Sequence, residues 1–227
     1  MLALTGPLHL HSLRPRKGRG VRIVVIDSGV YSSHPHVGGV AGGVSVDAEG
    51  GIGVDFVDRL GHGTAVTAVI REKAPGADVW AVRVFERRLD APITALVSAI
   101  DWALTRQPHL INLSLGTAKP EHRPALEAAV ARAIAAGAWI VAAGEENGVR
   151  WLPGTLDDVV SVRLDWSLSR DSCVLEAGAE GMRGLRVRAS GFPRPVPGVS
   201  PERNLKGLSF AVANATGLLA LAMEPAT

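Results

Sequence analysis

Residues 21–26 form an almost wholly β-branched run, Val-Arg-Ile-Val-Val-Ile, which ends at the polar residue Asp27. Such a run, without regular polar alternation, is typical of a strand covered on both faces of a parallel sheet. Strands alternating with helices favour a doubly wound sheet. The sequence therefore predicts a three-layer, doubly wound α/β fold: a mostly parallel sheet with helices on both faces. Further strand patterns occupy residues 79–84, 110–115, 139–143 and 159–164, and helical patterns occupy residues 61–73, 92–105 and 121–136.

The chain has 227 residues, of which 47% are hydrophobic, and this suits one α/β domain with a sizeable core. We expect an irregular N-terminal arm over residues 1–20 and a single domain over residues 21–227, with no propeptide. The Gly-rich stretch 38–53 lacks the Gly-Lys-Ser/Thr ending of a phosphate loop, so it predicts turns and a short hairpin. Residues 210–223 predict a buried helix.

Composition and charge argue against several classes of protein. The formal net charge is +2 and aromatic residues make up 4%, which disfavours a nucleic-acid partner. Cys173 is the only cysteine, so the chain has no internal disulfide and no Cys-based zinc cage. The longest apolar stretch, residues 208–223, is interrupted by polar residues and is too short to span a membrane. We therefore expect a cytoplasmic protein without a membrane partner.

Three short motifs carry residues that suit nucleophilic catalysis. Asp27 ends a predicted strand, at the sheet edge where open α/β proteins place their sites. His62 lies between two glycines at a predicted helix start. Ser209 precedes the apolar segment 210–223, where free N–H groups and the helix dipole would stabilise an oxyanion. Each motif alone also has a structural explanation, as a turn former, a buried histidine or a helix cap. The order Asp, His, Ser, however, is one of the known orders of a catalytic triad.

Together these motifs resemble the subtilisin-like serine proteases, the subtilases, from about Val21 to about Leu221. The resemblance implies a serine endopeptidase in which Ser209 is the nucleophile, His62 the general base and Asp27 the residue that orients the histidine. The segments that carry it are DSGVYSSHP from Asp27, GHGTAV from Gly61, INLSLG from Ile111, VAAG from Val141 and GLSFA from Gly207.

The same resemblance implies where a peptide substrate would lie. An extended substrate would add a strand beside Ser114, Leu115 and Gly116 through main-chain hydrogen bonds. Ala142, Ala143 and Gly144 would form one wall of the first specificity pocket, and Leu152-Pro153-Gly154 would supply part of the opposite side.

The sequence departs from the family where an asparagine usually donates to the oxyanion. Glu145 occupies that position without gaps, and Asn147 occupies it if two residues are inserted. Three hypotheses follow: burial holds a proton on Glu145 so that it can donate, Asn147 folds back, or the enzyme is weak or inactive. The helix after Ser209 also departs, with Asn214-Ala-Thr-Gly where His-Val-Ala-Gly is common, and Leu208 replaces the family's usual threonine.

The leading hypothesis is an intracellular protease with narrow specificity, such as removal of a leader peptide during maturation of a protein or modified peptide. Its partner would be a polypeptide substrate, such as one cognate precursor, and an activating partner is a further candidate. We expect no cofactor and no metal site; calcium is a candidate, but no clear calcium loop occurs. The pairs His9/His11 and His34/His36 are interpreted as loop residues. The alternative function is a peptide-binding pseudoprotease with an impaired oxyanion hole. A nucleotide-binding strand is disfavoured because no G-x-G-x-x-G follows it.

Overall fold

The computed structural model describes residues 5–86, 88–176, 184–200 and 203–226. In this part of the chain ten strands form one sheet, in the order β1-β11-β12-β10-β7-β6-β2-β5-β3-β4. Every pair from β12 to β3 is parallel, and antiparallel strands extend the sheet at both ends. The strands are β1 (Gly6–His9), β2 (Arg22–Asp27), β3 (Gly42–Val46), β4 (Ile52–Gly53), β5 (Asp78–Arg83), β6 (Leu110–Leu113), β7 (Trp139–Ala143), β10 (Val160–Leu164), β11 (Ser172–Glu176) and β12 (Arg186–Ala189).

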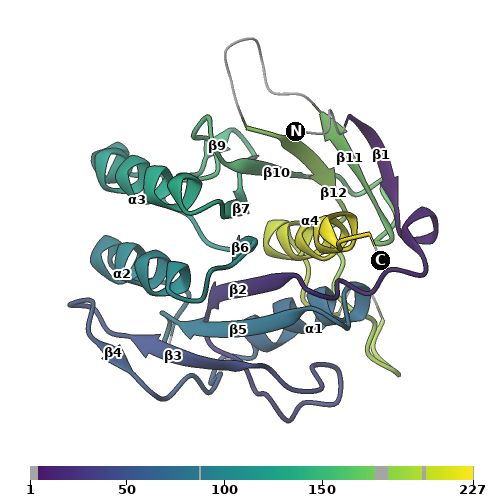
Figure 1. Ribbon diagram of the computed structural model, residues 1–227, viewed down its shortest axis with the longest axis horizontal. Helices are drawn as coiled ribbons and strands as arrows, with labels where there is room; N and C mark the ends of the chain where they lie inside the picture. The colour runs from purple at the N-terminus through teal and green to yellow at the C-terminus, as the bar shows by residue number, and fades with distance from the viewer. Residues whose placement is uncertain (1–4, 87, 177–183, 201–202, 227) are drawn as a thin grey trace.

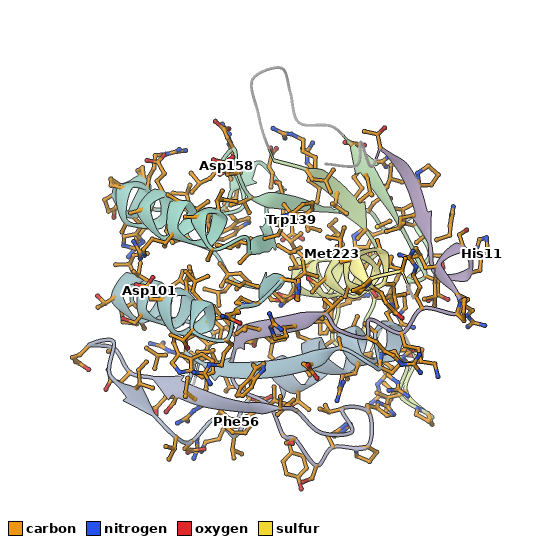
Figure 2. All side chains as sticks on the ribbon, viewed as in Figure 1. His11, Phe56, Asp101, Trp139, Asp158 and Met223 are labelled. Atoms are coloured by element: carbon orange, nitrogen blue, oxygen red, sulfur yellow. The ribbon has the colours of Figure 1, made fainter. Side chains whose placement is uncertain are left out.

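Helices cover both faces of this sheet (Figure 1). Helices α1 (His62–Lys73) and α4 (Leu208–Met223) pack against each other on one face. Helices α2 (Ile93–Leu104) and α3 (Arg123–Ala135) cover the other face. Figure 2 labels Asp101 on α2, which accepts hydrogen bonds from Arg132 of α3. Two short 3-10 helices occupy Leu10–Leu13 and Pro120–His122. The predicted three-layer α/β architecture is therefore confirmed.

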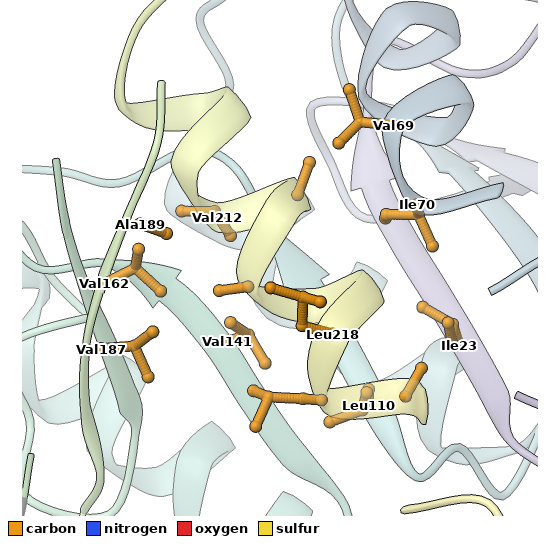
Figure 3. Close-up of a cluster of buried hydrophobic side chains, with 14 of the residues drawn as sticks. Ile23, Val69, Ile70, Leu110, Val141, Val162, Val187, Ala189, Val212 and Leu218 are labelled. Atoms are coloured by element: carbon orange, nitrogen blue, oxygen red, sulfur yellow. The ribbon is translucent and has the colours of Figure 1, made fainter. Parts of the chain in front are cut away.

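The core is divided by the sheet because successive side chains of a strand point to opposite faces. In β6, Leu110 belongs to the apolar cluster beneath α4, whereas Ile111 and Leu113 belong to the cluster beneath α2 and α3. Figure 3 shows Leu110 with Leu218 in the first cluster. Helix α4 is buried along nearly its whole length, which explains its apolar composition on every side.

The predicted strands and helices are present with ends that differ by at most two residues. The expected arm over residues 1–20 is not irregular throughout, and this expectation is corrected: β1 pairs antiparallel with β11, and Leu8 lies opposite Cys173 over the core. The predicted hairpin within residues 38–53 is present as β3 and β4, but β3 also joins the main sheet beside β5. Its glycines allow this because a Cβ at Gly42 would lie 2.7 Å from the ring of Trp80.

Candidate active site

Asp27 and His62 are joined by a short hydrogen bond at the carboxyl end of β2. His62 Nδ1 lies 2.7 Å from Asp27 Oδ1, and the same oxygen accepts the backbone N–H of Ser28 at 2.7 Å. Asp27 is completely buried and the side chain of His62 is 14% exposed, because α1 begins directly over the end of β2. An N–H at Nδ1 bonded to a carboxylate leaves Nε2 free to accept a proton.

The glycines that flank His62 allow this close approach. A Cβ at Gly63 would lie 2.2 Å from the carbonyl oxygen of Gly29 and 3.2 Å from Asp27 Cβ, so a larger residue would push α1 away from β2. Gly61 has φ 84°, in the left-handed region that favours glycine. The Gly-His-Gly sequence is therefore needed to bring the imidazole to the carboxylate.

Asp58, which the sequence analysis missed, holds the start of α1. Its Oδ1 accepts the N–H groups of Leu60 and Gly61 and the hydroxyl of Ser28, and its Oδ2 accepts both the N–H and the hydroxyl of Thr64. Ser28 Oγ also accepts the N–H of Gly63 at 2.8 Å. The sequence signal for this role was an aspartate four residues before His62, because aspartate is a residue type that caps helix starts.

These contacts shift two pKa values in opposite directions. Burial alone would lower the pKa of His62, but the hydrogen bond and negative charge of Asp27, with a smaller contribution from Asp58, raise it above its ordinary value. Burial alone would raise the pKa of Asp58, but the hydrogen bonds from Thr64, Leu60 and Gly61 outweigh it and lower that pKa. Asp58 is therefore held as a carboxylate near the imidazole.

Ser209 lies in the first turn of α4, close to the same site. Its Oγ donates to the carbonyl oxygen of Ser114 at 3.1 Å, immediately after β6. The ring of the next residue, Phe210, lies 5.8 Å from the ring of His62, measured between centroids. Within the described residues, the hydroxyl of Ser209 is bonded to Ser114 and not to His62. The three triad candidates therefore gather at one edge of the sheet, but the serine hydroxyl points to the neighbouring strand end.

The three segments expected to bind substrate also lie together. Leu113 of β6 is paired with Ala142 of β7, so both strands end side by side. Thr117 and Leu152 exchange backbone hydrogen bonds of 2.9 and 2.8 Å, and a Cβ at Gly154 would lie only 1.8 Å from the carbonyl oxygen of Ala143. The ends of β6 and β7 and the segment 152–154 thus form a continuous border beside Ser209.

The structure brings neither oxyanion candidate into hydrogen-bond contact with Ser209. Glu145 begins a separate hairpin, β8 (Glu145–Glu146) with β9 (Val149–Arg150), and its carboxylate lies 3.5 Å from the guanidinium of Arg163. Its side chain is 40% exposed, so the burial on which the first hypothesis depends is missing. Asn147 is exposed at the turn, where it and Gly148 have φ 51° and 78°. This is the pattern of a type I′ hairpin turn, so Asn147 lies at the tip of the β8–β9 hairpin.

No group of three or more His, Cys, Asp or Glu side chains in the described chain is placed to hold a metal ion. The rings of His9 and His11 lie 5.3 Å apart, and the Nδ1 of His34 accepts the backbone N–H of His36. Among the described helices, none combines the length and the apolar character needed to cross a bilayer.

The geometry defines an α/β protein with an Asp-His-Ser constellation at the sheet edge, and the comparisons with known proteins identify its class. The chain belongs to the subtilase family, whose model matches residues 18–171. Asp27 and His62 lie inside the matched segment, whereas Ser209 lies beyond its end.

Curated relatives are proteases. Subtilisin DY from Bacillus licheniformis is 30% identical over 227 residues, covering 92% of this chain and 78% of the relative. A thermostable alkaline protease from Halalkalibacterium halodurans is 35% identical over 141 residues, which cover 58% of this chain and 37% of that protein. Subtilisin E from Bacillus subtilis is 29% identical over 217 residues, which cover 88% of this chain and 52% of that protein. The chain thus spans only about a third to a half of the length of these last two relatives.

Two solved structures share the fold. The structure of the prenylagaramide maturation protease PagA superposes with a TM-score of 0.66 at 22% identity, covering 93% of this chain and 77% of that one. A cold adapted subtilisin-like serine proteinase gives a TM-score of 0.65 at 24% identity, covering 92% of this chain and 77% of that one. These likenesses establish the subtilisin-like fold.

Proposed function

We propose that this protein is a serine endopeptidase in which Asp27, His62 and Ser209 form the catalytic triad. The observation that carries the proposal is the 2.7 Å contact between His62 Nδ1 and the buried carboxylate of Asp27, close to the helix that carries Ser209 in its first turn. Family membership and the named activities of the curated relatives support it.

Catalysis would begin with a change of hydrogen-bond partner. Ser209 Oγ leaves the carbonyl of Ser114, donates to His62 Nε2 and attacks the carbonyl carbon of the substrate while its proton passes to the imidazole. The charged imidazolium is stabilised by Asp27. Collapse of the tetrahedral intermediate breaks the C–N bond, and His62 returns the proton to the leaving amine. Water then hydrolyses the acyl ester by the same route in reverse order.

Binding of substrate would assist this change. An extended peptide beside Ser114, Leu115 and Gly116 brings a main-chain N–H that can replace the Ser209 hydroxyl as donor to the carbonyl of Ser114. Ala142, Ala143 and Gly144 would border the first specificity pocket. At the start of α4, the N–H groups of Phe210 and Ala211 donate to the carbonyl of Gly207. The N–H of Ser209 comes before these donors and has no acceptor within the helix, so it is available to an oxyanion.

The substrate in this proposal is a polypeptide cut at one site during maturation, within the cytoplasm and without a cofactor. The fold shared with a protease that is named for maturation supports this class of substrate. The lone buried thiol of Cys173 suits a reducing compartment. The narrowest form of the proposal is removal of a leader from a small cross-linked subunit, as in quinohemoprotein amine dehydrogenase.

A peptide-binding pseudoprotease is the second candidate, favoured by the 40% exposed carboxylate of Glu145, which stands at the position where an oxyanion donor is expected. The two are separated by labelling with a fluorophosphonate, which reacts with an activated serine, and mapping the label by mass. The proposal predicts a label on Ser209 in the wild type and none in Ser209→Ala. A folded wild-type protein that takes no label supports the pseudoprotease. Rapid cutting of casein at many sites would contradict narrow specificity.

A further inference from the structure

Helix α4 and the segment made of β6 and the residue after it each carry two polar residues, at the spacing that directs both toward the other element. Asn112 lies in β6 and Ser114 directly follows the strand, two residues further on, so both share the face that Leu110 presents to α4. Ser209 and Thr216 are seven residues apart, which is close to two helical turns and places both on the β6 side of α4. Asn112 and Thr216 are completely buried in a cluster that is otherwise apolar.

These four residues form one chain of hydrogen bonds. Thr216 Oγ1 lies 2.9 Å from Asn112 Oδ1, and Asn112 Nδ2 donates to Ser114 Oγ at 2.8 Å. Ser114 Oγ in turn donates to the carbonyl oxygen of Ser209 at 3.4 Å, and Ser209 Oγ donates to the carbonyl of Ser114 at 3.1 Å. The chain thus links the middle of α4 to its first turn through two residues of the neighbouring strand segment.

The orientation of the Asn112 amide depends on both of its neighbours. Its oxygen accepts from Thr216 and its nitrogen donates to Ser114, so each end of the amide is satisfied. A buried polar group that loses its hydrogen-bond partner still bears the free-energy cost of desolvation. The Asn112 amide would therefore turn or shift toward another partner if Thr216 or Ser114 no longer bonded to it. The single proton of Thr216 is shared with the carbonyl of Val212, 2.9 Å away, so the hydroxyl also ties the helix backbone to β6.

We propose that Thr216 and Asn112 are positioning residues that fix Ser209 and Ser114 relative to each other through this chain of hydrogen bonds. The inference rests on the proposed function, because Ser209 acts there as the nucleophile and Ser114 as the main-chain acceptor of the substrate. Rigid support of a nucleophile matters because a displacement of about 1 Å can reduce a reaction rate by roughly 10²-fold.

The test compares Thr216→Val, which keeps the shape and removes the hydroxyl, with Thr216→Ser, which keeps the hydroxyl. Thr67→Val is the matched control, because Thr67 is also completely buried in the helix beside α4 but its Oγ1 has no hydrogen-bond partner in the described chain. For each protein the maximal rate of fluorophosphonate labelling and the half-saturating probe concentration are measured well below its melting temperature.

We expect Thr216→Val to lower the maximal labelling rate by roughly ten-fold or more with little change in half-saturation, consistent with a displaced nucleophile. Thr216→Ser and Thr67→Val should stay within about two-fold of the wild type. Equal rates for Thr216→Val and the wild type would overturn the inference while leaving the proposed function intact. A wild type that takes no label contradicts the proposed function instead.

If Thr216→Val fails to fold, Thr216→Cys takes its place. The thiol of cysteine is similar in size to the hydroxyl of threonine but is a weaker hydrogen-bond donor. An intermediate rate for Thr216→Cys supports the positioning role. A labelling rate of Thr216→Cys equal to that of the wild type contradicts the positioning role. Loss of labelling in Thr216→Ser, if its melting temperature is unchanged, also contradicts the positioning role.

Discussion

Asp27 Oδ1 contacts His62 Nδ1 at 2.7 Å, while its Oδ2, equally buried, has no hydrogen-bond partner in the described chain. The carboxylate therefore directs its one strong side-chain contact to the imidazole. A buried charge with so few donors depends on that contact, and the imidazole in turn depends on the carboxylate for its orientation.

Asp27→Asn should therefore remove most of the activity without removing the fold. The asparagine keeps the size of the side chain and can still accept the N–H of Ser28, but its amide favours the wrong tautomer of His62. By the precedent of other triads, the rate of fluorophosphonate labelling should fall on the order of 10⁴-fold. Asp101→Asn, at an exposed ion pair on α2, is the control and should label like the wild type. A loss below ten-fold would mean that Asp27 does not orient the base.

Asp58→Ala should lower both stability and the pKa of His62. Loss of the hydrogen bonds that hold the start of α1 should cost about 1–2 kcal/mol of unfolding free energy. Loss of a nearby negative charge should move the His62 titration, followed by NMR, to lower pH. Because the proposed base must be neutral to act, the acid limb of the labelling rate should lie above the ordinary pKa of a histidine in the wild type and move down in the variant.

Asp47→Ala provides the control for that experiment. Asp47 accepts the N–H groups of Glu49 and Gly51 in the β3–β4 hairpin, so its removal also loses amide hydrogen bonds. The control should lose stability and leave the His62 titration unchanged. An equal shift in both variants would indicate a general effect of net charge.

Glu145→Asn should raise the labelling rate, because an amide at this position can donate to the oxyanion where the carboxylate repels it. One such donor contributes on the order of 10²-fold in characterised serine proteases. Glu146→Asn removes the neighbouring charge of the same hairpin and should have little effect. An unchanged rate in Glu145→Asn would show that the hairpin holds position 145 away from the reacting carbonyl.

Lys73→Met should stabilise the protein at neutral pH. Lys73 Nζ is buried between α1 and α4 without a hydrogen-bond partner in the described chain, 3.7 Å from a carboxylate oxygen of Glu72 and 4.0 Å from one of Asp171. Burial, together with the charge of Arg170 and despite these two carboxylates, lowers its pKa from 10.5 to about 8. A shift of this size corresponds to roughly 3 kcal/mol that opposes folding while the lysine is charged.

The pH dependence of that effect has a definite sign. Below pH 8 both folded and unfolded states hold the proton and the destabilisation is complete. Between pH 8 and 10.5 the folded state releases the proton first, so the wild type gains stability. The advantage of Lys73→Met in melting temperature should therefore shrink as the pH rises through this interval. Lys119→Met, at an exposed position, should show no such trend, and a constant advantage for Lys73→Met would contradict a charged buried lysine.

Much of the fold could be predicted because buried β-branched strands and helices alternate along the chain. The strands that escaped prediction lack this signature. Arg186–Ala189 alternates arginine with apolar residues, since only one face of β12 packs on the core. The hairpin of β3 and β4 was predicted, but the place of β3 in the main sheet was not. There Gly42 and Gly43 are required by the rings of Trp80 and Phe56, which no local pattern reveals.

The site was predictable where chemistry and backbone geometry coincide in a short motif. Gly-His-Gly is an example, because the contacts of Gly63 forbid a side chain. Asn147-Gly148 is a strong sequence signal for a type I′ turn. The contact of Glu145 with Arg163 was nevertheless not predicted, because Arg163 comes from another strand. The bond between Thr216 and Asn112 joins residues 104 apart in the chain and requires the packed fold to be seen.

The nearly complete burial of α4 determines how the proposed active site can come apart. Amide protons in its central turns should exchange with solvent only when the whole domain opens, whereas those of the peripheral β8–β9 hairpin should exchange by local fluctuation. Ser209 lies in the first turn of this helix, next to these buried turns. Fluctuations at the edges of the sheet should therefore leave Ser209 in place, and mild heating should abolish labelling in a single step together with global unfolding.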